Sequence, residues 1–133
     1  MISGGCLCGS VRYESRGDPV FSVLCHCRDC QRASGTGGVP VMGVPRSTFR
    51  VTGETKSYGV TATSGTQSIR HFCPNCGSLL FGTPEGFPEI VSIYAGSLDS
   101  QDTFQPQHAM FTRDRPDWLK IVPNIPEYET VPA

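Results

Sequence analysis

The fold of this chain depends on two short cysteine turns, Cys6-Leu7-Cys8-Gly9 and Cys73-Pro74-Asn75-Cys76-Gly77. A tight turn between two cysteines aims backbone N–H groups at the sulfurs, and the following glycine accepts the backbone conformation that the turn needs. Tetrahedral zinc takes four ligands, which two such turns far apart in the sequence can supply. We therefore predict that Cys6, Cys8, Cys73 and Cys76 form a structural zinc site. The alternative is a redox-active Cys-x-x-Cys pair, which usually begins a helix beside a βαβ unit, and the sequence shows no such unit.

A third group of cysteines lies between these turns, in the stretch Cys25-His26-Cys27-Arg28-Asp29-Cys30. Three protein ligands and an open fourth position are typical of a catalytic zinc site, where water or a substrate takes the free position. The sequence thus predicts a second zinc held by Cys25, Cys27 and Cys30, with a small thiol or thiol adduct as substrate. Two alternatives stay open. A fourth protein ligand could close the site, or the three thiols could be free or redox-active.

Several side chains are candidates for completing or assisting the middle cluster. The possible fourth ligands are His26, Asp29, His71 and His108. His26 lies between two ligands in the chain, so we expect its side chain to point away from their metal, and we consider it for proton transfer. His71 stands two residues before Cys73 on an expected strand and could share its face. Three thiolates outweigh the charge of a zinc ion, so Arg28, Arg32 or backbone N–H groups should also matter.

Length and composition limit the other functions that are open to the chain. With 133 residues it has the size of one domain, which we place at residues 1–123, followed by an extended tail at 124–133. The net charge is −1, so no basic excess favours nucleic acid or an anionic membrane as partner. We expect no signal peptide and no membrane-spanning helix, and hence a cytoplasmic location. Seven cysteines cannot all pair with one another as disulfides, and a reducing compartment disfavours disulfides altogether.

Short strand patterns dominate the rest of the sequence. Apolar and polar residues alternate over 10–14, 48–52 and 67–72, and mainly apolar runs occupy 21–24, 39–44, 79–81 and 90–94. Turn-forming residues separate these runs at short intervals, which is typical of an all-β architecture. One short helix is expected from about Arg28 to Ser34, ended by Gly35. The predicted fold is therefore mainly β with one short helix.

Three stretches of the chain resemble motifs of a known family. Gly4–Tyr13, Cys25–Arg32 with Ser34-Gly35, and Phe72–Leu80 are similar to the three cysteine motifs of the glutathione-dependent formaldehyde-activating enzyme family, also called the CENP-V/GFA family. Gly96–Asp99, Pro106, His108 and Trp118 also fall where the family pattern would put them. The resemblance implies an Mss4-like fold of packed antiparallel sheets bearing zinc. It also implies a structural zinc at Cys6, Cys8, Cys73 and Cys76 and a catalytic zinc at Cys25, Cys27 and Cys30.

The same resemblance implies carbon–sulfur chemistry, the joining of glutathione and formaldehyde into S-hydroxymethylglutathione. We therefore expect a zinc-dependent carbon–sulfur lyase-like enzyme that acts on a small thiol adduct of an aldehyde such as formaldehyde. A non-catalytic zinc-binding interaction module and a thiol redox or metal sensor are the alternative functions. The sequence does not define the oligomeric state.

Overall fold

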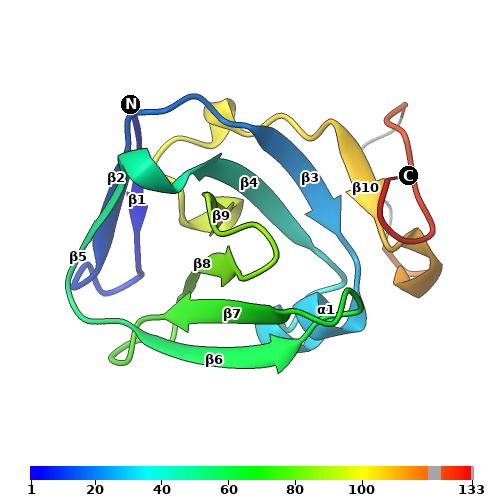
Figure 1. The fold of residues 1–133 in the computed structure, drawn as a ribbon, viewed down its shortest axis with the longest axis horizontal. Helices are drawn as coiled ribbons and strands as arrows, with labels where there is room; N and C mark the ends of the chain where they lie inside the picture. The colour runs from blue at the N-terminus through cyan, green and yellow to red at the C-terminus, as the bar shows by residue number, and fades with distance from the viewer. Residues whose placement is uncertain (120–123, 133) are drawn as a thin grey trace.

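The computed structural model describes residues 1–119 and 124–132, which form two β-sheets and one α-helix (Figure 1). The smaller sheet has the strand order β1-β2-β5, and the larger has the order β10-β3-β4-β9-β8-β7-β6. The strands are β1 (Ile2–Gly5), β2 (Arg12–Ser15), β3 (Phe21–Cys25), β4 (Val39–Pro45), β5 (Phe49–Thr52), β6 (Lys56–Thr61), β7 (Gln67–Phe72), β8 (Leu79–Pro84), β9 (Ile90–Tyr94) and β10 (His108–Met110). Neighbouring strands are antiparallel except β10, which runs parallel to β3. The prediction of a mainly β fold with one short helix is confirmed.

The main hydrophobic core lies between the two sheets. The smaller sheet and its turns contribute Ile2, Val11, Tyr13 and Phe49, and the larger sheet contributes Met42, Val44, Leu80, Phe81, Val91 and Ile93. Two cysteines of the outer turns, Cys6 and Cys73, are buried in the same core. The two turns therefore meet where the sheets pack on each other.

Strand β4 is apolar without alternation because it is buried on both faces. Met42 and Val44 face the main core, whereas Val39 and Val41 pack in a second cluster together with Cys25 and Cys30. A strand that is covered on both sides has no solvent face, so a continuous apolar run is expected. This second cluster places the middle cysteines on the opposite side of β4 from the main core.

The helix α1 (Arg28–Ser34) begins and ends where the sequence predicts. Gly35 follows it in the left-handed conformation, with φ of 71°, and its N–H donates to the Gln31 carbonyl at 2.8 Å. Such a glycine cap stops a helix without the steric cost that a Cβ would bring. Figure 1 shows α1 at one end of the curved larger sheet, directly after β3.

Residues of the C-terminal segment run beside β10, at the opposite side of the molecule from β1 (Figure 1). The Ala109 N–H donates to the Pro126 carbonyl at 2.9 Å, and the Tyr128 N–H donates to the Ala109 carbonyl at 3.0 Å. These hydrogen bonds attach the segment to the edge of the larger sheet. The domain boundary expected after residue 123 adjoins residues 120–123, which lie outside the described residues.

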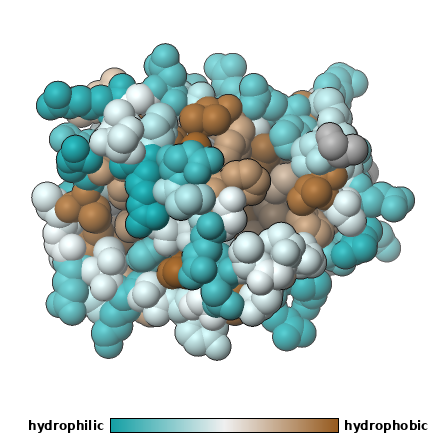
Figure 2. Space-filling view, in the orientation of Figure 1, coloured by the Kyte–Doolittle hydropathy of each residue, from teal (hydrophilic) through white to brown (hydrophobic). Residues whose placement is uncertain are grey.

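The face of the molecule seen in Figure 2 carries hydrophobic side chains in separate patches between polar ones. Large exposed hydrophobic residues come from distant parts of the chain, among them Leu7, Tyr58, Phe87 and Trp118. Single exposed hydrophobic side chains of this kind are common on folded proteins. None of the described helices is both long enough and apolar enough to cross a membrane.

Candidate metal centre and adjoining pocket

The four cysteines of the outer turns come together as a compact group. Their sulfur atoms all lie within 4.8 Å of one another, with Cys6 and Cys8 3.6 Å apart and Cys8 and Cys73 3.8 Å apart. Sulfurs around a tetrahedral zinc, at about 2.3 Å from the metal, are about 3.8 Å apart. The fourth member is Cys76. This cluster can therefore hold a metal ion with little rearrangement.

Backbone N–H groups and a serine hydroxyl donate hydrogen bonds to sulfurs of this group. Val11 N–H donates to Cys6 Sγ at 3.2 Å, and Cys76 N–H lies 3.5 Å from Cys73 Sγ. Hydrogen bonds from Ser78, first of all its hydroxyl, lower the pKa of Cys76 to about 5. Hydrogen-bond donors stabilise a thiolate, and a thiolate is the form that binds metal.

The two turns need their glycines. Gly9 has a φ of 83° and Gly77 a φ of 75°, both in the left-handed region. The Gly9 N–H donates to the Cys6 carbonyl at 3.1 Å, and the Gly77 N–H donates to the Cys73 carbonyl at 2.8 Å. Each glycine thus closes its turn in the conformation expected from the sequence.

The middle cysteines form a second group whose sulfurs also lie within 4.8 Å of one another. Cys25 ends β3, Cys27 caps the N-terminus of α1, and Cys30 lies in the first turn of that helix. Cys25 Sγ and Cys30 Sγ are 3.6 Å apart, and Cys27 Sγ accepts a hydrogen bond from the Cys30 N–H at 3.3 Å. The strand end and the helix start therefore bring together three sulfurs that are close in sequence.

The three sulfurs differ in their affinity for protons. Hydrogen bonds from the thiols of Cys25 and Cys30 hold the pKa of Cys27 far below its usual range. Hydrogen bonding with Cys27 and Cys30, together with burial, raises the pKa of Cys25. Cys27 is also the most exposed of the three, since Cys25 and Cys30 are buried. The lowered pKa therefore belongs to the most accessible of the three sulfurs.

Arg70, on β7, is the side chain that donates to this cluster. Its Nη2 lies 3.4 Å from Cys30 Sγ. Arg28, which the sequence suggested for this role, instead donates to Gln31 Oε1, and Arg32 is exposed. The sequence shows Arg70 only as a polar residue in an alternating strand, and only the packing of α1 near β7 reveals its contact.

The histidines and the aspartate considered as a fourth ligand do not join the middle cluster. Within the described residues, the middle group contains its three cysteines without a fourth histidine, cysteine or carboxylate. His71 stacks on Phe81 with ring centroids 4.6 Å apart and lies 2.8 Å from Thr83 Oγ1. His108 makes an edge contact with the ring of Tyr128, and Asp29 is exposed in the first turn of α1.

His26 lies between Cys25 and Cys27 in the sequence, and its side chain is buried. Its side chain is 1% exposed, and its Nδ1 lies 2.9 Å from the Gly37 carbonyl oxygen. Its Nε2 has no hydrogen-bond partner in the part of the chain that the structure describes. The Gly37 contact fixes the orientation of the ring, and a role for His26 in proton transfer stays a prediction.

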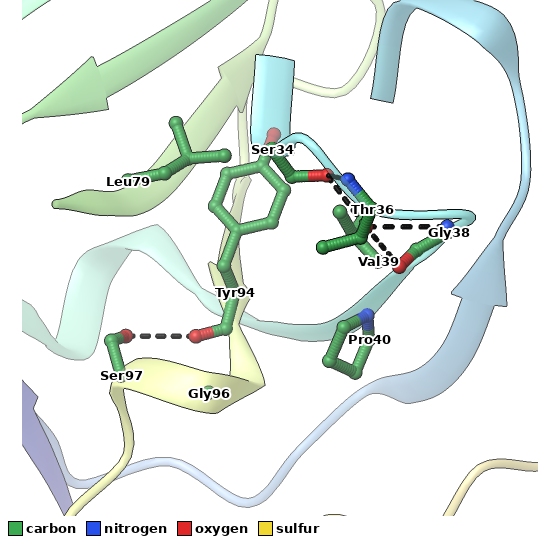
Figure 3. Close-up of a pocket in the computed structure, with 9 residues that line it drawn as sticks. All are labelled: Ser34, Thr36, Gly38, Val39, Pro40, Leu79, Tyr94, Gly96 and Ser97. Carbon is green, nitrogen blue, oxygen red and sulfur yellow. Dashed lines mark hydrogen bonds between the residues drawn. The ribbon is translucent and has the colours of Figure 1, made fainter. Parts of the chain in front are cut away.

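A pocket of about 180 Å³, whose lining Figure 3 shows, is formed in part by residues that neighbour Cys25 and Cys30. Its lining residues are Ser34, Thr36, Gly38, Val39, Pro40, Leu79, Tyr94, Gly96 and Ser97. Ser34 Oγ donates to the Cys30 carbonyl at 2.7 Å, and Val39 pairs with Cys25 between β4 and β3. Tyr94 packs against the hydrophobic cluster that contains Cys25 and Cys30. The sequence did not predict this pocket, because three separate segments of the chain contribute its lining, although Ser34, Leu79, Gly96 and Ser97 lie in stretches that resemble the family motifs.

The ring of Tyr94 stands in the middle of this pocket, between Leu79 and the loop of Ser34 and Thr36 (Figure 3). Burial raises the pKa of Tyr94, so its hydroxyl stays protonated at neutral pH. The Ser34 and Thr36 hydroxyls are 2.7 Å apart, and Thr36 Oγ1 also donates to the Gly38 carbonyl. Hydroxyl groups on a largely apolar wall suit a small, weakly polar ligand.

The fold and the two cysteine clusters define a class, a mainly β domain that can hold metal ions at two places. Within this class, the model of the family described as "Glutathione-dependent formaldehyde-activating enzyme" matches residues 1–114. The chain belongs to this family, so the resemblance seen in its three cysteine motifs is confirmed. Membership supports glutathione-dependent formaldehyde activation, in which a small thiol is the partner.

Individual relatives agree with this assignment. A Halomonas elongata protein named "Putative glutathione-dependent formaldehyde-activating enzyme" is 29% identical over 127 residues, which cover 91% of this chain and 81% of the relative. The crystal structure of a Rhodobacter sphaeroides protein superimposes with a TM-score of 0.61 at 20% identity, covering 78% of this chain and 96% of the other. The structural match supports the fold, and the sequence match supports the family.

Proposed function

We propose that the chain is a zinc-dependent carbon–sulfur lyase that joins a small thiol, such as glutathione, to formaldehyde and also catalyses the reverse reaction. The observation that carries this proposal is the middle cluster. It brings three cysteine sulfurs together beside a pocket, and no fourth ligand comes from the described residues. This is the donor arrangement of a catalytic metal site rather than a closed structural one.

Both clusters fit zinc by the chemistry of their donors. Sulfur-only donor sets select soft or borderline metals, and tetrahedral sites of this type usually hold zinc. We assign the structural zinc to Cys6, Cys8, Cys73 and Cys76, and the catalytic zinc to Cys25, Cys27 and Cys30. A zinc ion bound there would acidify an incoming thiol and could polarise a carbonyl oxygen.

The proposed reaction is an addition without any change of oxidation state. The thiol sulfur forms a bond to the carbon of formaldehyde while the carbonyl π bond breaks, and the thiol proton ends on the former carbonyl oxygen. In the lyase direction the carbon–sulfur bond breaks and the same proton returns to sulfur. We propose Tyr94 as the neutral hydrogen-bond donor to the aldehyde oxygen, which its position in the pocket and its raised pKa support.

The sequence also supports a proposal for the location and partners of the enzyme. We propose a cytoplasmic protein whose partner is a small thiol, with no nucleic acid and no membrane, because the charge of −1 provides no basic surface excess. Reduced glutathione is abundant in that kind of compartment, where thiols stay reduced.

The proposal can be tested by exchange NMR with ¹³C-formaldehyde and glutathione, combined with native mass spectrometry for the metal content. We expect the wild type to bind two zinc ions and to accelerate adduct formation above the spontaneous rate. Cys27→Ser should keep one zinc and lose the acceleration, whereas Arg32→Met, on the exposed side of α1, should retain both properties. Unchanged zinc content and rate in Cys27→Ser would refute a catalytic site at this cluster.

A further inference from the structure

Arg70 occupies an unusual position for an arginine. It lies in the middle of β7, opposite Gly82 of β8 and Tyr58 of β6, and it is half-buried. Its Nη2 donates to Cys30 Sγ at 3.4 Å, whereas its Nε is buried and has no hydrogen-bond partner among the described residues. Burial of a guanidinium is costly unless an anion or good acceptors compensate for the lost water.

No carboxylate provides that compensation in residues 1–119 and 124–132. The ion pairs found there join Arg12 to Asp99 and Arg115 to Glu127. Among the described residues, the sulfur of Cys30 accepts a hydrogen bond from Arg70, and the Tyr94 hydroxyl also lies close enough to interact with the guanidinium. This contact places a permanently charged donor against the sulfur of Cys30, where it would stabilise that sulfur as a thiolate when it binds a metal.

The charges of the proposed site agree with this stabilisation. Three thiolates and one divalent metal ion have a net charge of −1, and the Arg70 guanidinium brings the sum to zero. Arginine suits the task because it stays charged when buried and holds its donors in a rigid plane. A charge-assisted hydrogen bond to a ligand sulfur also withdraws electron density from it, and partners of this kind orient and tune metal ligands.

We infer that Arg70 is a positioning residue of the three-cysteine site, holding Cys30 as an anionic ligand and neutralising the excess negative charge of the metal-loaded cluster. The inference rests on the proposed metal site and adds a residue from a distant strand to it. Arg70 acts through Cys30, so its removal should weaken the middle metal site and leave the four-cysteine site intact.

The test is a titration of the metal-free protein with Co²⁺ alone. Binding is monitored through the thiolate-to-cobalt charge-transfer absorption. Wild type, Arg70→Met, Arg70→Lys and Arg32→Met are compared, and Cys27→Ser identifies the absorption of the four-cysteine site. We expect two cobalt ions in the wild type and in Arg32→Met. In Arg70→Met the second ion should bind about 10- to 100-fold more weakly, the usual effect of losing a residue that supports a ligand. Arg70→Lys should bind it with intermediate affinity, because it restores the charge without the planar donors.

Different results separate this inference from the proposed function. If the wild type binds two ions and Arg70→Met binds both with unchanged affinity, the role of Arg70 is wrong and the metal site stands. If the wild type binds no ion at the middle cluster, both ideas are wrong. The absorption of the four-cysteine site shows whether each variant is folded. If Arg70→Met lacks that absorption, the affinity of Arg70→Lys for the second ion is compared with the wild type instead. In that case, an affinity equal to the wild type in Arg70→Lys would contradict a need for the planar guanidinium.

Discussion

Asp99 shows how a single exposed residue can connect parts of the chain that are distant in sequence. Its carboxylate accepts hydrogen bonds from the Arg12 guanidinium of β2 and from Ser3 Oγ of β1, the latter at 2.8 Å. Its own N–H donates to the Ser3 carbonyl at 2.9 Å. The smaller sheet is thereby tied to the segment that follows β9.

These contacts make the stability of the fold depend on pH. The hydrogen bonds from Arg12 and Ser3 lower the pKa of Asp99 below its ordinary value. A carboxyl group with a lowered pKa in the folded state stabilises the fold above its unfolded pKa of about 4, and this contribution is lost as the pH falls through the lowered pKa. We expect Asp99→Asn to have a slightly lower urea midpoint than wild type at neutral pH, and the two midpoints to converge in strong acid. Asp102→Asn, also exposed, is the control, and an equal gap between Asp99→Asn and wild type at both pH values would contradict this origin.

At the scale of elements, α1 is important because it contains Cys30 and is capped at its N-terminus by Cys27. Its end depends on Gly35, whose φ is 71°. A Cβ built on Gly35 would meet no atom within 4 Å, so the cost of a side chain there is purely conformational. We expect Gly35→Ala to lower the free energy of unfolding by about 1 kcal/mol, the usual cost of the left-handed conformation for a residue with a Cβ. Gly35→Asn should lower the free energy of unfolding by less, because asparagine tolerates the left-handed conformation better. Chemical denaturation measures the free energy of unfolding of both variants. Equal stability of Gly35→Ala and wild type would show that the cap adapts.

The elements that the sequence predicts well are those with a clear period or cap. The alternation over 67–72 matches β7, and the expected helix matches α1. Strands β1, β6 and β10 were not predicted, for physical reasons. β1 is Ile-Ser-Gly-Gly, β6 is an edge strand with little burial, and β10 has three residues that depend on a parallel partner. The sequence did not predict the contact of Arg70 with the middle cluster for a similar reason. Its role arises from the packing of α1 near β7 rather than from any local motif.

At the scale of the whole molecule, the four-cysteine cluster is the polar link between the two sheets. Cys6 and Cys8 lie in the turn between β1 and β2 of the smaller sheet, and Cys73 and Cys76 lie between β7 and β8 of the larger one. The Leu7 N–H also donates to Ser78 Oγ across this junction at 3.1 Å. The cysteine spacing predicted the members of this cluster, whereas the pocket beside the other cluster required the assembled fold.

This position predicts that the two clusters differ in what their loss does to the fold. Cys76→Ser removes a proposed ligand from the cluster that joins the sheets, so the proposed metal can no longer contribute to folding, and we expect complete loss of cooperative thermal unfolding. Cys27→Ser, the matched control, changes a partly exposed proposed ligand at the N-terminus of α1 and should still melt cooperatively. Circular dichroism during heating, with metal content determined in parallel, measures both. A Cys76→Ser variant that melts as cooperatively as Cys27→Ser would mean that hydrophobic packing alone, around residues such as Leu80 and Ile93, holds the two sheets together.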